Sequence, residues 1–253
     1  MAELSPMMKQ YMEIKSQNED SILFFRVGDF YEMFFDDAKK ASEELDLVLT
    51  GKDCGQEERA PMCGVPYHSC EAYIARLVEK GYKVAICEQT EDPATAKGLV
   101  RRDIIRVVTP GTVIEDAMLE EGKNNYLASL NLTEEGAGLC FTDASTGECH
   151  ATVLSGDNSE NDVKDELTRF SPKELLVSED LKTKSAALWE YIAKGFSATV
   201  TVRQSASFNP EITEPLFVKH FGEEVIEQLG IKKQGAIASA LGAVIEYLYE
   251  TFR

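Results

Sequence analysis

Residues 24–38, Phe-Phe-Arg-Val-Gly-Asp-Phe-Tyr-Glu-Met-Phe-Phe-Asp-Asp-Ala, decide how the first part of this sequence folds. They continue an apolar run at residues 22–27, which predicts a buried strand. Gly28 predicts a sharp turn after this strand. Over residues 30–45, apolar side chains recur at a spacing of four, which is typical of a helix. The sequence therefore predicts a strand, a glycine turn and a helix whose first turn carries Phe30.

A ring and a carboxylate follow the turn, and together they suit contact with nucleic acid. In the first turn of a helix, Phe30 can project beyond the domain, where free N–H groups and the helix dipole face a ligand. A ring so placed can wedge between stacked bases and kink a duplex. Glu32 is near enough to hydrogen-bond the same base, and a mispaired step is easier to unstack than a matched one. Taken alone, however, these residues fit a core phenylalanine and a solvated glutamate better than a DNA contact.

The rest of the first half mixes helices with strands, which predicts a compact α/β domain. Ser5-Pro6 resembles an N-cap followed by proline at the first helical position, and predicts a helix to about Lys15. Ser69 is expected to cap another helix, which Gly81 ends. Short strands are predicted at residues 47–50, 83–87 and 104–108, and a polar loop at residues 51–61.

An acidic segment poor in β-formers, residues 115–125, is the best candidate for a linker. Beyond it, three strands precede alternating helices and strands, which is the element order of the ribonuclease-H-like fold and predicts no activity by itself. We expect an α/β domain with a mixed sheet at residues 1–115, a linker at 116–123 and a ribonuclease-H-like domain at 124–253. The expected elements are strands at residues 126–130, 138–144, 148–154, 174–177 and 199–202, helices at 162–170 and 184–193, and further C-terminal helices.

The net charge of -18 argues against an extensive nucleic-acid surface, because affinity for DNA comes largely from Lys and Arg on phosphates. Both halves share the acidity, with 14 basic and 21 acidic residues in 1–115 and 12 and 23 in 116–253. The local exception is residues 97–106, where Lys97, Arg101, Arg102 and Arg106 are opposed only by Asp103. A duplex-binding surface must therefore be small, local or completed by other parts.

Cysteine usage and hydropathy indicate the compartment. The six cysteines are scattered through a chain too large to need disulfides, which predicts reduced thiols in a cytoplasm. No stretch approaches the roughly 18 to 20 apolar residues of a membrane helix, and the first residues carry no secretory pattern. We expect a cytoplasmic protein without a membrane partner.

Several sequence blocks resemble the MutS family of DNA mismatch-repair proteins. They occur in that family's order and spacing across residues 5–113, and together they are highly specific. Similarity over residues 124–253 is looser, and rests on Asn124-Asn125-Tyr126-Leu127-Ala128 and Asp143-Ala144-Ser145-Thr146-Gly147-Glu148. The blocks of the first half are Gly28-Asp29-Phe30-Tyr31-Glu32, Pro61-Met62-Cys63-Gly64-Val65-Pro66-Tyr67-His68, Val84-Ala85-Ile86-Cys87-Glu88-Gln89 and Val107-Val108-Thr109-Pro110-Gly111-Thr112.

The resemblance implies roles for particular residues. Phe30 would stack on a mispaired base from the minor groove, and Glu32 would hydrogen-bond that base. The first domain would be the family's mismatch-recognition domain, and the second its connector domain, which offers a surface to the partner MutL near residues 215–220. The other residues implied at the DNA are Arg26, Met62, Pro66 and His68 near the duplex, and Lys97, Arg101 and Arg102 at phosphates.

The resemblance also implies which domains and cofactors of the family this chain lacks. The family's lever, clamp and ATPase domains would lie beyond Arg253, so ATP and magnesium belong to the full-length protein. We expect no catalysis, no cofactor and no metal in this chain, which is expected to be monomeric, whereas the full-length protein would be a homodimer. The second function that we consider is a protein–protein module, which docks MutL and binds DNA negligibly.

Three enzymatic or metal-binding interpretations fit less well. Cys63-x4-His68-x-Cys70, with Cys54 nearby, lacks the ligand spacing of ordinary zinc sites. Asp143 and Glu148 could belong to a nuclease, but Asp143 more simply accepts N–H bonds of the turn that follows it. A Walker loop is absent, because neither Gly51-Lys52 nor Gly122-Lys123 precedes Ser or Thr.

Overall fold

The computed structural model describes residues 3–253, apart from the side chain of Lys232. The chain divides into two compact units, of which the first comprises the residues up to Thr109 together with Thr251–Arg253, and the second extends from Pro110 to Glu250. Each unit combines helices with a mixed sheet, which confirms the predicted α/β class. The predicted boundaries at residues 115 and 124 stay a prediction. Among the described residues, no helix has the length and apolar character needed to cross a membrane.

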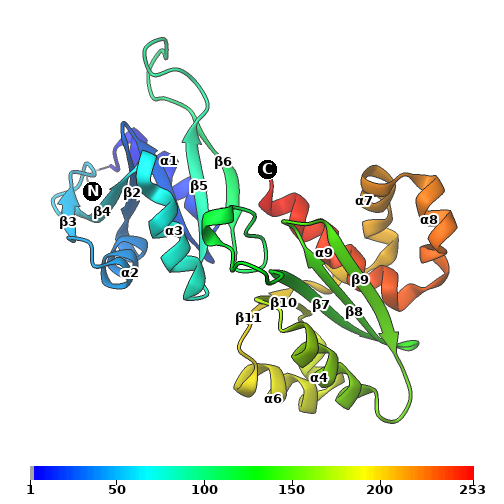
Figure 1. Cartoon of the computed structure of the whole chain (residues 1–253). Coiled ribbons are helices and arrows are strands. Elements are labelled where there is room, and N and C mark those ends of the chain that lie inside the picture. The colour runs from blue at the N-terminus through cyan, green and yellow to red at the C-terminus, as the bar shows by residue number, and fades with distance from the viewer. Residues whose placement is uncertain (1–2) are drawn as a thin grey trace. The chain divides into compact units, whose positions relative to one another are not determined.

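The first unit is built on a six-stranded sheet with the strand order β3-β4-β2-β1-β5-β6 (Figure 1). Strand β1 pairs in parallel with β5, and the other neighbouring strands pair antiparallel. The strands are β1 (Ser21–Val27), β2 (Phe30–Phe34), β3 (Thr50–Lys52), β4 (Ala60–Pro66), β5 (Lys83–Gln89) and β6 (Arg102–Val108). The helices are α1 (Pro6–Ser16), α2 (Phe35–Leu45), α3 (Cys70–Glu79) and the 3-10 turn η1 (Tyr67–Ser69).

Helices cover both faces of this sheet. On one face, Met8 and Tyr11 of α1 join a core that includes Phe25 and Phe34 of the sheet. On the other face, the thiol of Cys63 donates to the carbonyl oxygen of Ala38 in α2, at 3.4 Å. Helix α1 forms as predicted, because Ser5 accepts a hydrogen bond from the N–H of Met8 and proline occupies the first helical position.

The predicted helix over residues 30–45 is wrong in its first part, since Phe30–Phe34 is strand β2. This segment pairs on both sides, with β1 and with β4, and its aromatic residues favour a strand. The chain turns from strand to helix at Phe35, whose φ of +52° is unusual for an aromatic residue. Phe34 and Ala38 are both buried, but Phe34 ends the strand and Ala38 lies in the helix. Their spacing of four therefore resembles a helical pattern although no single helix contains both.

Smaller expectations also change in this unit. The strand expected at residues 47–50 lies at Thr50–Lys52, and β4 begins inside the expected loop, at Ala60. Ser69 precedes α3 but makes no side-chain capping bond, because its hydroxyl donates to the carbonyl oxygen of Pro66 at 3.5 Å.

The second unit has a five-stranded sheet with the order β11-β10-β7-β8-β9. Strands β7, β8 and β9 are antiparallel neighbours, and β10 and β11 extend the sheet in parallel from β7. This arrangement confirms the predicted ribonuclease-H-like order. The strands are β7 (Tyr126–Thr133), β8 (Gly136–Asp143), β9 (Glu148–Leu154), β10 (Glu174–Ser178) and β11 (Thr199–Arg203). The helices are α4 (Ser159–Phe170), α5 (Leu181–Lys184), α6 (Ala186–Gly195), α7 (Pro210–Phe221), α8 (Glu223–Leu229), α9 (Gly235–Thr251) and the short η2 (Asp116–Met118), η3 (Ser205–Phe208) and η4 (Ile231–Lys233).

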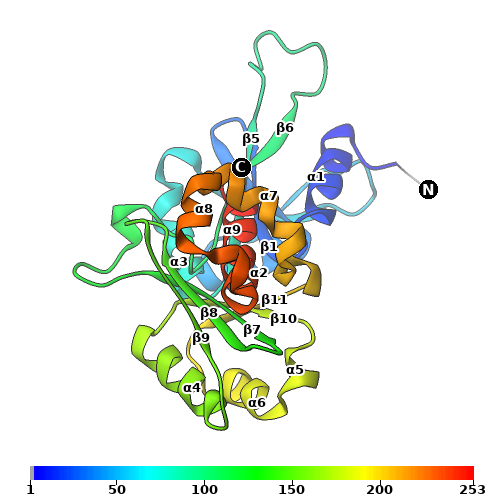
Figure 2. The ribbon, with the colours of Figure 1, turned by 90° about the vertical axis from the view of Figure 1, so that its right-hand side faces the viewer.

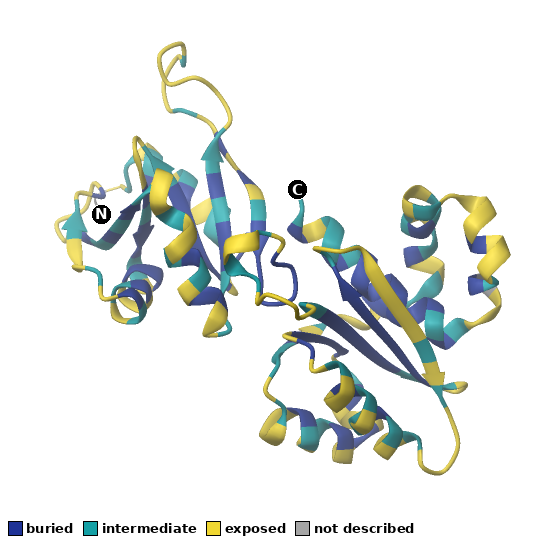
Figure 3. Cartoon of the chain, viewed as in Figure 1, coloured by how far each residue is buried: buried dark blue, intermediate teal, exposed yellow. Residues whose placement is uncertain are grey.

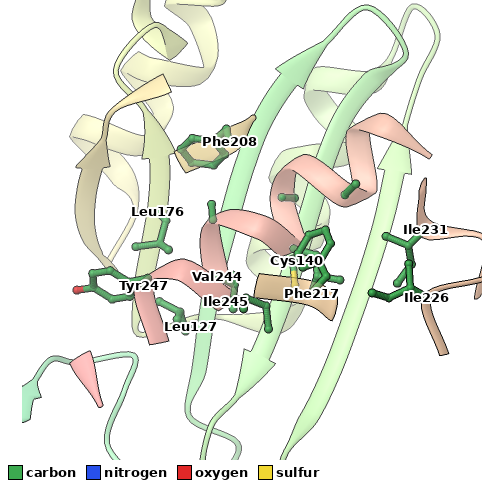
Figure 4. Packing of buried hydrophobic residues seen from close by; sticks show 14 residues of the cluster. Leu127, Cys140, Leu176, Phe208, Phe217, Ile226, Ile231, Val244, Ile245 and Tyr247 are labelled. Atoms are coloured by element: carbon green, nitrogen blue, oxygen red, sulfur yellow. The ribbon is translucent and has the colours of Figure 1, made fainter. Parts of the chain in front are cut away.

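Two hydrophobic cores lie on opposite faces of the second sheet. Helices α4, α5 and α6 pack on one face, and α7, α8 and α9 pack on the other (Figure 2). In the second core, Val244, Ile245 and Tyr247 of α9 pack with side chains of the central strands (Figure 4). Strands β7 and β8 are therefore buried along most of their length, whereas the edge strand β9 is largely exposed (Figure 3).

A buried carboxylate joins several elements of the second unit. Glu174 is fully buried and accepts hydrogen bonds from the backbone N–H of Gly111 (3.1 Å), the hydroxyl of Thr201 (2.7 Å) and the hydroxyl of Tyr247 (2.7 Å). A Cβ at position 111 would come within 2.8 Å of Glu174, so only glycine allows this approach. Glu174 thus holds the start of the unit against β11 and α9.

Replacing Glu174 with alanine should destabilise the second unit by about 3 kcal/mol or more, because three buried donors lose their acceptor. Chemical denaturation followed by circular dichroism measures this change. Glu190→Ala is the control, since Glu190 lies on the surface in an exposed ion pair with Lys194 and should change the free energy of unfolding by less than about 0.5 kcal/mol. Equal effects of the two substitutions would contradict the role assigned to Glu174.

Candidate functional site

A tight hairpin carries the residues of the predicted site. Strands β1 and β2 are joined by only two residues, Gly28 and Asp29, since Val27 pairs with Phe30. Gly28 has a φ of +56°, and glycine suits the first position of such a loop because it adopts positive φ without strain. The N–H of Tyr67 donates to the carbonyl oxygen of Asp29 at 3.0 Å, which ties η1 to the loop. Phe30 is therefore held immediately after a short, braced turn.

The ring of Phe30 faces solvent. Phe30 is 46% exposed, whereas Phe24, Phe25 and Phe34 of the same hairpin are fully buried. The interpretation of Phe30 as an ordinary core residue is therefore wrong. A large exposed ring at the end of a hairpin is available to a ligand.

The alternation of side chains along β2 places Phe30 and Glu32 on one face, since residues two apart in a strand point the same way. Their Cα atoms are separated by roughly 7 Å along an extended strand. Across the ladder, Phe30 pairs with Pro66 and Phe34 pairs with Met62. The structure therefore brings Met62 and Pro66 to the same face as the ring and the carboxylate.

Glu32 is paired with a lysine that sequence reasoning missed. The Nζ atom of Lys52, in β3, forms an ion pair with Oε2 of Glu32. Both side chains are largely covered, with 14% of the glutamate and 28% of the lysine side chain exposed. No periodicity links these positions, because Lys52 lies in a three-residue strand inside a polar segment.

Arg26 is held by its neighbours rather than free. It lies one position from the turn, with Nη1 2.9 Å from Oε1 of Glu88, and its guanidinium carbon lies 3.5 Å from the ring centroid of Tyr67. The hydroxyl of Tyr31 also donates to Glu88. Burial, together with that carboxylate, raises the pKa of Tyr31. Tyr67 and Glu88, which were not among the predicted site residues, therefore fix Arg26 beside the hairpin.

Arg102 does not fit the phosphate contact predicted for it, because it is buried. Its guanidinium donates to the carbonyl oxygen of Arg26 (2.6 Å), to that of Val100 (2.9 Å) and to the side-chain oxygen of Gln10 (3.0 Å). Burial lowers the pKa of Arg102, and the nearby carboxylate of Glu32 opposes this shift. Arg102 is a structural cation that joins α1 to the end of the sheet.

The other predicted basic residues are exposed. Lys97 and Arg101 belong to the loop between β5 and β6, which extends beyond the sheet in both ribbon views (Figures 1 and 2). Within this loop, the carboxylate of Glu91 accepts a hydrogen bond from the backbone N–H of Arg101 at 2.7 Å, which links the two sides of the loop. His68 is exposed beside Tyr67, with ring centroids 5.8 Å apart.

The structure also bears on the zinc-site and nuclease interpretations. Cys63 is buried against α2, while His68 is on the surface. Among residues 3–253, no group of three His, Cys, Asp or Glu side chains is arranged to hold a metal ion. Asp143 accepts hydrogen bonds from the backbone N–H groups of Ser145 (2.9 Å) and Asn125 (3.0 Å), which confirms its predicted structural role in the turn.

Known proteins match nearly all of this chain. Residues 5–117 match the family model of MutS domain I, and residues 125–253 match that of MutS domain II. The chain is similar to the DNA mismatch repair protein MutS of Acetivibrio thermocellus (49% identity over 99% of this chain) and of Ruminiclostridium cellulolyticum (47% over 99%). It spans 28% of the length of each of these curated relatives.

Two adjacent arginines give a matched test of the site's construction. Arg102→Ala should lower the free energy of unfolding by about 2 to 4 kcal/mol, because it removes buried charge-assisted hydrogen bonds and packing on Phe25. Arg101→Ala, at an exposed position, should change it by less than about 0.5 kcal/mol. Urea denaturation measures both, and a destabilised Arg101 variant beside an unaffected Arg102 variant would refute this assignment.

Proposed function

This chain belongs to the MutS family, and on that premise we propose that it recognises mismatched or unpaired bases in double-stranded DNA. The exposed ring of Phe30, at the end of a braced hairpin, is the observation that carries the proposal. The ring enters the duplex at a weak step, and Glu32 on the same strand face accepts a hydrogen bond from the base that the ring contacts.

The wedge discriminates by the cost of deforming DNA. Inserting an apolar side chain between base steps costs a few kcal/mol of stacking and kinks the duplex. A mispaired or unpaired base has lost part of that stacking and pairing already, so the same insertion costs less there. Because Phe30 is already exposed, the protein gives up little of its own packing when the ring enters DNA.

Glu32 contributes selectivity rather than affinity. A carboxylate repels phosphates, which disfavours close approach to an intact duplex. An ionised carboxylate can only accept hydrogen bonds, so it favours a base that presents an N–H group. Pro66, which pairs with Phe30, forms an apolar border beside the ring, whereas Met62 lies further along the same face, opposite Phe34.

Phosphate contacts fall to the exposed residues Lys97 and Arg101, and not to Arg102, which is buried. Two such contacts provide little affinity against a net charge of -18. The curated relatives are several times longer than this chain. We assign further DNA contacts, ATP hydrolysis with magnesium and dimerisation to the remainder of a full-length MutS protein.

Phe30→Ala should abolish the preference for a mismatched duplex, with a loss of about ten- to a hundredfold in affinity for a G·T mismatch and little change for matched DNA. Fluorescence anisotropy at low salt measures both affinities. Ile212→Ala, which removes a similarly exposed apolar side chain from the second unit, is the control. A preserved mismatch preference in the Phe30 variant would overturn the proposal.

A second candidate function is docking of MutL by the second unit. The predicted docking segment, residues 215–220, lies in α7, where Phe217 is buried in the core, so only part of it faces outward. Next to it, α8 exposes Val225 (39%) and Leu229 (60%) on an acidic helix. Exposed apolar side chains one helical turn apart are a common anchor for a protein partner.

Docking and lesion recognition are separable. If α8 docks MutL, tagged chain should retain MutL in a pull-down, and the double substitution Val225→Ser and Leu229→Ser should remove that retention while mismatch binding is unchanged. Lys219→Ser, which alters the neighbouring helix without removing an apolar anchor, serves as the control. Absence of MutL with the unaltered chain would reject this candidate, whatever the DNA measurements show.

A further inference from the structure

The ion pair of Glu32 with Lys52 crosses an intervening strand. In the order β3-β4-β2, Lys52 and Glu32 lie on the two strands that flank β4. The β4 residue opposite Glu32 is Gly64. A Cβ there would lie 3.2 Å from the carbonyl oxygen of Tyr31, which is a tight contact, and 3.6 Å from Cγ of Glu32, which is ordinary van der Waals contact. Lys52 pairs with Ala60 of β4, so its side chain reaches across β4 to meet Glu32.

The lysine offsets the cost of covering a carboxylate. Only 14% of the Glu32 side chain is exposed. A charged group removed from water is costly unless a partner of opposite charge and hydrogen bonds compensate it. Arg102, whose charge also interacts with Glu32, already donates to two carbonyl oxygens and to Gln10. Lys52 is therefore the direct partner of Glu32.

The ion pair makes the two oxygens of the Glu32 carboxylate inequivalent. Lys52 occupies Oε2, while among the residues that the structure describes none hydrogen-bonds Oε1. A carboxylate with one oxygen engaged keeps acceptor capacity on the other, in an orientation that the ion pair determines. Glu32 is thus prepared to accept one more hydrogen bond from a ligand on its face of the sheet.

We propose that Lys52 is a positioning residue that sets the mismatch selectivity of this chain through Glu32. It orients the carboxylate so that Oε1 meets the N–H of an unpaired or mispaired base. The inference rests on the proposed function, and it assigns Lys52 no contact with the base.

The rival role for Lys52 is a direct phosphate contact, and the two roles predict different patterns. Loss of a phosphate contact weakens matched and mismatched DNA alike and reduces the salt dependence of binding. Loss of a positioning contact lowers the ratio of mismatched to matched affinity, and does so only while Glu32 is present. A double-mutant cycle separates these outcomes.

The experiment compares Lys52→Met, Glu32→Gln and the double variant in the protein at its full natural length. Binding of a G·T duplex and of its matched counterpart is measured by anisotropy across a salt series. Lys52→Met should reduce the ratio of mismatched to matched affinity about tenfold, as expected for loss of a hydrogen bond made by a charged group. In the Glu32→Gln background, the same substitution should leave the ratio unchanged. A ratio that is unaffected, or that falls equally in both backgrounds, overturns the inference.

Controls separate this result from loss of folding and from failure of the proposed function. Lys52→Arg keeps the charge and should restore most of the ratio, whereas Lys39→Met removes an exposed lysine paired with Asp36 and should leave it unchanged. Thermal melts identify a misfolded variant, and Lys52→Gln then replaces Lys52→Met in the cycle. If the unaltered protein shows no mismatch preference, the proposed function fails. If it shows a preference that Phe30→Ala removes but the Lys52 variants do not alter, only the present inference fails.

Discussion

Side chains of a β-strand alternate between its two faces, and the candidate site depends on this constraint. Along β2, alternation buries Tyr31 and Met33 on the face that α2 covers and leaves Phe30 and Glu32 together on the other face. Helix α1 covers that face only in part, so the strand runs from a closed core at Phe34 to an open end at Phe30. One strand thus supplies both the anchor and the residues offered to a ligand.

Much of this arrangement could be predicted from the sequence, because strongly patterned elements were recognisable one by one. The apolar run of β1, the capped start of α1 and the order of strands in the second unit depend on local composition. The element that carries the site was misassigned, since a five-residue aromatic strand joined directly to a helix mimics helical spacing. Phe30 and Glu32 were chosen as candidates from the family motif, which does not depend on that assignment, and their role stays a prediction.

Charge was harder to interpret, because the role of a cation depends on its burial and partners. Arg101 and Arg102 are adjacent in sequence, yet one is exposed on a loop and the other is buried between α1 and the sheet. Lys52 shows the opposite case, in which an unremarkable lysine is the direct partner of Glu32. The ion pair joins two strands that β4 separates, so it forms only when the sheet is assembled. No spacing of residues in the sequence predicts it.

The loop of two residues between β1 and β2 has a mechanical consequence. Because this connection is so short and Tyr67 is hydrogen-bonded to it, the ring of Phe30 cannot move far without the sheet. If the proposed function holds, a probe this stiff would leave bending to the DNA. The protein would then respond to the local deformability of the duplex, which chemically different lesions share, and not to the shape of one mispair.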